Sequence, residues 1–248
     1  MPIIVNQPIT GTQTALQIMQ QFAGRTGLRV PSYIQSNPDA QVVQLLGLMN
    51  EEIDDLASRY SWSQLQTEAT FLSTGAESQG SIDVIAPGMK NIIRDTLWSL
   101  TKRLAAMGSI TPQTTQLIKS LGNPSAATLY RLVRNELHFI PGTNIAAGAL
   151  YRFEYNSRYA ILDAATGLAK QYFEKDADTP RLPASLILLG LRWRWKAAKG
   201  LNYSENFSLY EEKVKQAYID AKDAAPISMY PREDVRPGIV IPQGSWNR

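Results

Sequence analysis

The chain reads Leu48-Met-Asn-Glu-Glu-Ile-Asp-Asp-Leu-Ala-Ser-Arg-Tyr-Ser-Trp62 along its most regular stretch. There and in the turns before it, apolar residues recur every three or four positions, as they do on one face of an amphipathic helix. They are Val43, Leu46, Met49, Ile53 and Leu56. Asp39 has a side chain suited to the N-cap position. The sequence therefore predicts a helix from about Asp39 to Tyr60.

Four acidic residues lie within this helix: Glu51, Glu52, Asp54 and Asp55. Carboxylates grouped on one helix could hold a metal ion or supply an acid–base pair. The solvent-facing side of an amphipathic helix has the same composition, and we favour that interpretation. Asp55 also stands four residues before Arg59, a spacing at which opposite charges pair.

Three further helices are predicted from the same periodicity. They run from about Thr12 to Ala23, from Pro183 to Lys199 and from Glu205 to Asp223. The apolar stripe of the last helix is Tyr210, Val214, Ala217 and Tyr218. We expect Glu211 and Lys215 to pair on its surface.

Strand signals fill the segment between these helices. Strand formers are concentrated from Leu65 to Leu72, and residues 95–100 are a candidate strand. A hairpin is predicted from residues 130–133 and 136–139, because Asn135 tolerates the left-handed backbone of a tight turn. Residues 149–155 alternate with period two, which indicates a strand with one buried face.

Two elements of this segment are helical candidates. Thr111-Pro112 is a helix start, and that helix should end at Gly122. Residues 163–167 resemble a turn between two short strands, although a helix through Leu168 and Tyr172 is an alternative. The pattern as a whole predicts an α+β protein with an α-helical bundle core, a β-rich insertion and an extended C-terminal arm. The expected boundaries are 1–62 and 179–225 for the core, 63–178 for the insertion and 226–248 for the arm.

The composition argues against several kinds of chemistry. The 248 residues include no cysteine and one histidine, so thiolate sites and multi-histidine metal sites are excluded. Phosphate-binding glycine patterns and the G-x-S-x-G elbow are absent. His138 lies on a predicted strand, and Asp176 and Asp178 match only half of a calcium loop. We therefore expect no enzyme activity, no cofactor, no metal and no catalytic residue.

The apolar runs are short. The longest spans Leu186 to Leu191, whereas a membrane helix needs about 20 such residues. The N-terminus lacks the pattern of a signal peptide. We expect a soluble protein that is synthesised in the cytoplasm and does not contact a membrane.

Residues 226–248 contain four prolines and no helical periodicity. They nevertheless keep large apolar side chains, which a solvated tail usually lacks. These are Tyr230, Ile239, Val240, Ile241 and Trp246. The segment is predicted to be an arm that binds a partner, with folding back onto its own helices as the alternative.

Arg192-Trp-Arg-Trp-Lys196 is the most unusual segment. As a strand it would present a basic and an aromatic face, as a nucleic-acid platform does. Helix formers flank it, so we favour a helix. The candidate DNA-facing or interface basic patch comprises Arg192, Arg194, Lys196 and Lys199.

The order of several motifs resembles a known family. A helix ending in Arg59 and Trp62 precedes a strand at residues 66–71. Residues 95–98, 151–155 and 176–180 follow. The last motif is Leu182-Pro, then Gly190-Leu-Arg-Trp-Arg-Trp-Lys and Lys199-Gly-Leu-Asn-Tyr203. This succession, covering roughly residues 10–225, resembles the head-to-tail adaptor (connector) proteins of tailed bacteriophages, especially short-tailed ones.

The resemblance implies a virion structural protein without catalysis. In that family the subunits, typically twelve, form a ring between the portal protein and the tail, in the neck of the virion, and line the DNA passage used in ejection. The implied partners are the portal, the tail nozzle or tube protein and identical neighbours, with DNA only as non-specific cargo. The alternative is a nucleic-acid-binding protein that uses the segment Arg192–Lys199.

Overall fold

The computed structural model describes residues 13–121, 128–142 and 145–221. They form a mixed α+β structure, as the sequence predicts. The helices are α1 (Ala15–Thr26), α2 (Ala40–Arg59), α3 (Ile82–Ile85), α4 (Pro112–Leu121), α5 (Ala184–Ala198), α6 (Ser204–Ala221) and the 3-10 turn η1 (Ser63–Leu65). The predicted arm at residues 226–248 lies outside the described residues.

Three small sheets contain the strands of the described residues. In the first sheet β1 (Gln66–Leu72), β9 (Leu150–Ser157), β4 (Trp98–Ser99) and β5 (Leu104–Ala105) follow in that order, and β3 (Met89–Ile92) also pairs with β9. The second has the order β2 (Ser78–Ser81), β8 (Glu136–Ile140), β7 (Leu129–Val133) and β6 (Met107–Gly108). The third has the order β11 (Ala169–Lys170), β10 (Ile161–Leu162) and β12 (Thr179–Pro180).

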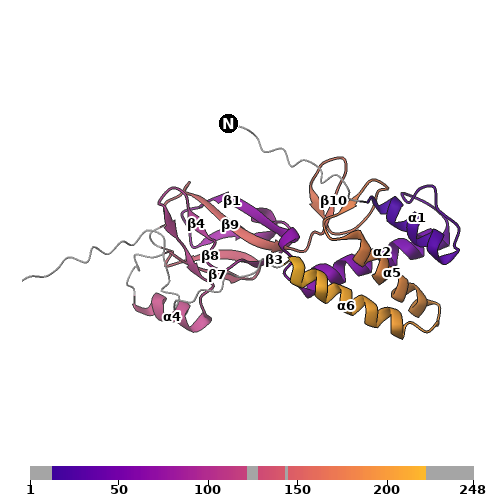
Figure 1. The fold of residues 1–248 in the computed structure, drawn as a ribbon. Coiled ribbons are helices and arrows are strands. Elements are labelled where there is room, and N and C mark those ends of the chain that lie inside the picture. Colours follow the sequence, from indigo (N-terminus) through magenta and orange to yellow (C-terminus); the bar gives the residue numbers. More distant parts are fainter. Residues whose placement is uncertain (1–12, 122–127, 143–144, 222–248) are drawn as a thin grey trace, which may run out of the picture.

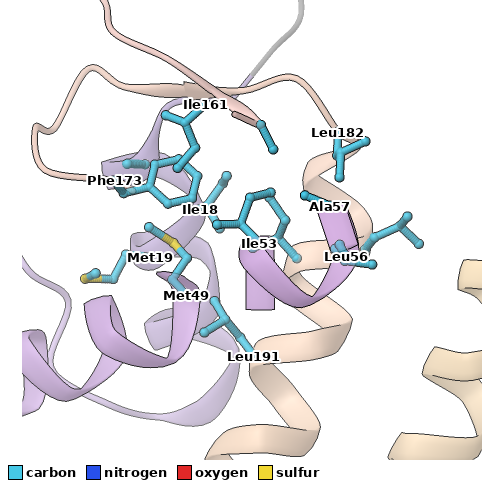
Figure 2. Close-up of a cluster of buried hydrophobic side chains, with 14 of the residues drawn as sticks. Ile18, Met19, Met49, Ile53, Leu56, Ala57, Ile161, Phe173, Leu182 and Leu191 are labelled. Atoms are coloured by element: carbon cyan, nitrogen blue, oxygen red, sulfur yellow. The ribbon is translucent and has the colours of Figure 1, made fainter. Parts of the chain in front are cut away.

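Two hydrophobic clusters divide the described residues into two regions, which lie at opposite ends of the ribbon in Figure 1. The helical region comprises α1, α2, α5 and α6 together with β10, β11 and β12. The strand region comprises β1 to β9 with α3 and α4. Within the helical region, Ile161 and Phe173 pack among the helices, as Figure 2 shows. Residues 160–178, assigned by sequence to the β-rich insertion, thus contribute side chains to the helical cluster.

The helix ends have identifiable causes. Thr14 and Gln17 form a reciprocal capping box that starts α1, and Gly27 ends it with a left-handed backbone at φ 70°. The predicted limits Thr12 and Ala23 were therefore a turn too early. Asp39 caps α2 as predicted, because its carboxylate accepts a hydrogen bond from the Gln41 amide at 2.9 Å.

The buried stripe of α2 differs from the prediction in its first two turns. Val42 and Leu45 are buried, whereas Val43 is 57% exposed. The sequence has Val-Val and Leu-Leu doublets there, and both members of each doublet fit helical spacing to Met49. From Met49 onward the predicted stripe is confirmed by the burial of Ile53 and Leu56.

The strand region confirms the predicted hairpin. Strands β7 and β8 pair antiparallel, and Arg134 and Asn135 in the turn have φ values of 50° and 64°. Positive φ at both central residues is the geometry that matches the twist of a hairpin. Strand β9 alternates as expected, with Tyr151, Phe153 and Tyr155 buried.

Other strand predictions were partly wrong. The candidate strand at 95–100 is reduced to β4, since Asp95 has a left-handed backbone at φ 61°. The turn at residues 163–167 does join two strands, β10 and β11, so the alternative helix through Leu168 and Tyr172 was wrong. Leu168 and Tyr172 are exposed and belong to no apolar stripe.

Candidate functional site

The basic and aromatic segment lies on α5, as the sequence favoured, and Lys199 is the C-cap residue of that helix. Its four cations differ in their exposure to solvent. Arg192 and Lys199 are exposed, and Lys196 is half-buried. Arg194 is buried and points to α2. Lys199 donates a hydrogen bond to the Gln44 side chain at 3.1 Å. The structure therefore does not bring Arg194 together with the other three cations.

Arg194 binds three carboxylates of α2 through its three guanidinium nitrogens. Nε lies 2.6 Å from Glu52 Oε2, Nη1 2.6 Å from Glu51 Oε1 and Nη2 2.9 Å from Asp55 Oδ2. Charge-assisted bonds of this kind are shorter and stronger than neutral ones. These four residues are called the arginine cluster below. It joins two helices whose members lie about 140 residues apart.

The interpretation of the four acidic residues of α2 as a solvent-facing side is wrong for Glu52. It is fully buried, and burial raises its pKa from 4.5 to about 7, although hydrogen bonds from Arg194 act in the opposite direction. The sequence contained a signal for this position. Glu52 stands three residues after Met49 and four before Leu56, which places it on the buried stripe.

The absence of a side chain at Gly190 leaves room for the Glu52 carboxyl group. A β-carbon built on Gly190 would lie 2.0 Å from the carboxyl carbon of Glu52. Helices α2 and α5 can thus approach each other at this point only if α5 carries no side chain there. The sequence alone gives Gly190 no role beyond its place in the motif Gly190-Leu-Arg-Trp-Arg-Trp-Lys196.

The arginine cluster extends toward α6. Arg59 pairs with Asp55 at 2.9 Å, as predicted, and also with Glu211 of α6. The expected surface pair of Glu211 with Lys215 is therefore replaced by a contact between helices. Burial, together with the neighbouring Glu52 carboxylate, raises the pKa of Tyr210, so its hydroxyl stays protonated.

The aromatic residues of this segment pack within the helical region. The ring centroid of Trp193 lies 5.1 Å from that of Phe207 and 6.1 Å from that of Tyr210. The Trp195 ring meets Phe22 edge-on at 6.3 Å. Both indoles are held by neighbouring helices, so they do not form a free stacking platform for bases.

A groove opens between α1 and the first half of α5, with a volume of about 660 Å³. Its apolar lining includes Phe22, Leu188 and Leu189, and its charged lining is Arg25 and Arg192. Among the described residues neither arginine has an ion-pair partner. The groove combines an apolar floor with two positive charges that the described residues leave without ion-pair partners.

The remaining candidates have structural partners. His138 on β8 lies 3.4 Å from Glu77 and 3.3 Å from Glu136. Asp176 accepts the backbone amide of Ile34 at 2.6 Å. Asp178 accepts two backbone amides and pairs with Lys170 at 2.8 Å. In the part of the chain that the structure describes, acidic residues and His138 form no group arranged to hold a metal ion.

Two further observations concern membrane helices and similarity to known proteins. No helix within the described ranges has both the length and the apolar character required to cross a membrane. The sequence matches no protein-family model and no curated protein.

Proposed function

We propose that this protein is a non-enzymatic structural subunit of a tailed-phage virion, a head-to-tail adaptor. In this proposal it forms a ring, with twelve copies as in the family it resembles, between the portal and the tail protein in the neck. The ring lines the passage for DNA, which is non-specific cargo. The chain is organised as a helical bundle core, a β-rich insertion and a C-terminal arm.

One observation supports the proposal above the others: the first and the last motif that carry the resemblance, far apart in the sequence, meet in the helical region. Arg194, in the last motif, binds the carboxylates of the first. The first and last motifs of the succession that resembles the adaptor family are thus in direct contact.

The partners of the charged residues also favour a structural role. The groups that a catalytic site would use are engaged with one another: Glu52 with Arg194, and Asp178 with Lys170. A general acid or base needs access to a substrate, whereas Glu52 and Asp178 are completely buried. His138 carries no role in this proposal, and H138Q should leave particle assembly intact.

Nucleic-acid binding through Arg192–Lys199 is the weaker proposal. Arg194 is bound within the arginine cluster and Trp193 is packed against α6, so neither side chain is free to contact nucleic acid. Three cations would remain, and duplex binding by so few phosphate contacts is weak, with a salt dependence proportional to their number. A filter-binding titration at low and moderate salt separates this proposal from docking to a protein ring.

Electron microscopy tests the leading proposal. The purified chain, which we expect to be mainly monomeric by light scattering, is mixed with a candidate portal ring. The proposal requires an added ring of density on one face of the portal. A chain truncated after Ala225 is the matched variant: it should keep the melting temperature and lose the added ring, since the arm is proposed to bind the portal or a neighbour.

A stable dodecamer of the pure protein at micromolar concentration would contradict the assembly order. Failure of the full-length chain to bind the portal would contradict the function itself. A fall of many degrees in the melting temperature of the truncated chain would show that residues 226–248 belong to its own core.

A further inference from the structure

The groove between α1 and α5 has a composition that selects its occupant. Phe22, Leu188 and Leu189 offer an apolar floor, and Arg25 and Arg192 add two positive charges without ion-pair partners among the described residues. The side-chain oxygen of Gln21 is buried at the same place and has no hydrogen-bond partner there. A complementary ligand is convex, apolar at its tip and negatively charged beside it.

The strand region carries an exposed apolar side chain with a carboxylate next to it at α3. Val84 is 82% exposed, the largest exposed fraction among the large apolar residues of the described chain. Asp83, next to it, is also exposed and carries the negative charge. The two residues form an apolar tip with a carboxylate at its side, called the α3 tip below.

The α3 tip is held in one conformation. Ile82 is buried beneath it and donates its amide to the Asn135 carbonyl at 2.8 Å. Ser81 caps the turn at the Asp83 amide, and the Asn135 side chain donates to one oxygen of Asp83 at 2.6 Å. Within residues 13–121, 128–142 and 145–221, the second oxygen of that carboxylate accepts no hydrogen bond, so it can accept one from another donor. A preorganised tip loses little conformational entropy when it binds.

We infer that the α3 tip of one copy docks into the α1–α5 groove of the next copy, with Val84 on the apolar floor and Asp83 beside Arg25 and Arg192. The groove and the tip are different surfaces of one subunit, so the contact is head-to-tail. Repeated head-to-tail contacts close into rings when the rotation between neighbours allows it. The inference rests on the proposed function and specifies how neighbouring subunits recognise each other.

The contact can be tested by cysteine crosslinking, because the chain has no cysteine of its own. One preparation carries V84C and another carries S185C, where Ser185 lines the groove and is exposed. The two are mixed, assembled on the portal ring and treated with a short bifunctional maleimide. We expect a crosslinked dimer from the mixture and little from either variant alone. L117C, at another exposed apolar position, replaces V84C as the matched control.

Intact rings by microscopy without the V84C–S185C dimer, or with an equal yield from L117C, overturn the docking contact and leave the adaptor function standing. The same crosslinking is carried out on concentrated protein without portal. A specific dimer there, combined with no portal binding, keeps the contact and overturns the proposed function. Absence of the dimer under both conditions overturns the contact.

A charge exchange gives an independent readout. The S185C preparation, which supplies the groove, also receives R25E/R192E. It should then need a protein concentration at least about tenfold higher to give the same yield of V84C–S185C crosslink, since two attractive charges become repulsive. Adding D83R to the V84C preparation, which supplies the α3 tip, should restore most of the crosslink yield. R94E/K213E, which changes the charge equally at exposed positions elsewhere, should have little effect. A loss as large in the control, or no recovery with D83R, counts against the contact.

Discussion

The helical and strand regions are held together by different kinds of buried polar group. The helical region buries charged side chains: Glu52, Asp163, Asp178 and Arg194. Within residues 63–121, 128–142 and 145–157, the buried polar side chains are all neutral. They are Ser73, Gln79, Ser99, Thr115, Asn156 and Ser157.

The reason lies in how each kind of element finds its neighbour. Strands specify their partners through backbone hydrogen bonds, and β1 pairs with β9 over seven consecutive residue pairs. The backbone hydrogen bonds of a helix are formed within the helix itself. The position of one helix against another therefore depends on side-chain packing. In this protein Arg194, between three carboxylates, determines the alignment of α2 and α5.

The largest expected effect comes from removing that arginine. R194M leaves Glu51, Glu52 and Asp55 without their shared cation, and breaking a buried ion pair typically costs about 3–5 kcal/mol. Urea unfolding at pH 8 should show a loss of this size. E52L/R194M, which removes the buried charge as well, should regain a large part of it. An R194M variant as stable as the parent would show that the arginine cluster does not hold the helices.

The second effect is a dependence on pH. The pKa of Glu52 is about 7 in the folded protein, because burial raises it, and about 4.5 in the unfolded chain. Between these values the unfolded chain releases the proton and the folded protein keeps it, so stability should fall as the pH rises from about 4.5 to 7. At about 1.4 kcal/mol per pKa unit, the loss is on the order of 3 kcal/mol.

The comparison with E52Q isolates this contribution from other titrating groups. Unfolding free energies measured at several pH values should fall more steeply for the parent than for E52Q across the interval. Parallel curves would show that Glu52 has an ordinary pKa. The opposite slope would show that the pairing with Arg194 outweighs burial.

A smaller effect is expected at the close approach of the two helices. In G190A the new β-carbon would meet the Glu52 carboxyl group, and relieving such overpacking typically costs about 1–3 kcal/mol. Gly47 on α2 is the matched control, because a β-carbon there meets nothing within 4 Å. G47A should raise stability by up to about 1 kcal/mol through helix propensity. Equal effects of both substitutions would remove the special role of Gly190.

The smallest effect tests the strand region. Ser73 is buried, donates to the Ala146 carbonyl at 2.5 Å and accepts from the Ala149 amide at 3.0 Å. S73A should cost about 1–2 kcal/mol, since it leaves the buried amide of Ala149 without its partner. Between pH 5 and 8 the cost should stay constant, because these partners do not titrate. A cost that changes with pH would show that titrating groups also stabilise the strand region, contrary to the difference described between the two regions.

The sequence predicts best where a pattern is local. The cap at Asp39, the turn at Arg134-Asn135 and the alternation of β9 each depend on neighbouring residues, and all three are confirmed. The doublets Val42-Val43 and Leu45-Leu46 were placed in the wrong register because helical spacing admits either member. Two-residue strands such as β10 are too short to show a period.

The candidate site was less predictable because its contacts are distant in sequence. Glu52 stands on the buried stripe of α2, yet its partner Arg194 lies 142 residues away. A charged residue on an apolar stripe signals a buried partner without indicating which cation provides it. Arg25 and Arg192 likewise meet at one groove only because α1 packs beside α5.

The long-range assembly of the helical region has a consequence during synthesis. Helices α1 and α2 emerge from the ribosome first, but their core needs Leu191 of α5 and Val214 of α6. The strand region is complete at Ser157, so it can fold while the last 91 of the 248 residues are still to be added. At about 5–20 residues per second, the apolar faces of α1 and α2 remain without these partners for roughly 7–30 seconds. The nascent chain should therefore be a client for chaperones at its N-terminal helices, and ribosome profiling of bound chaperone would locate that interval.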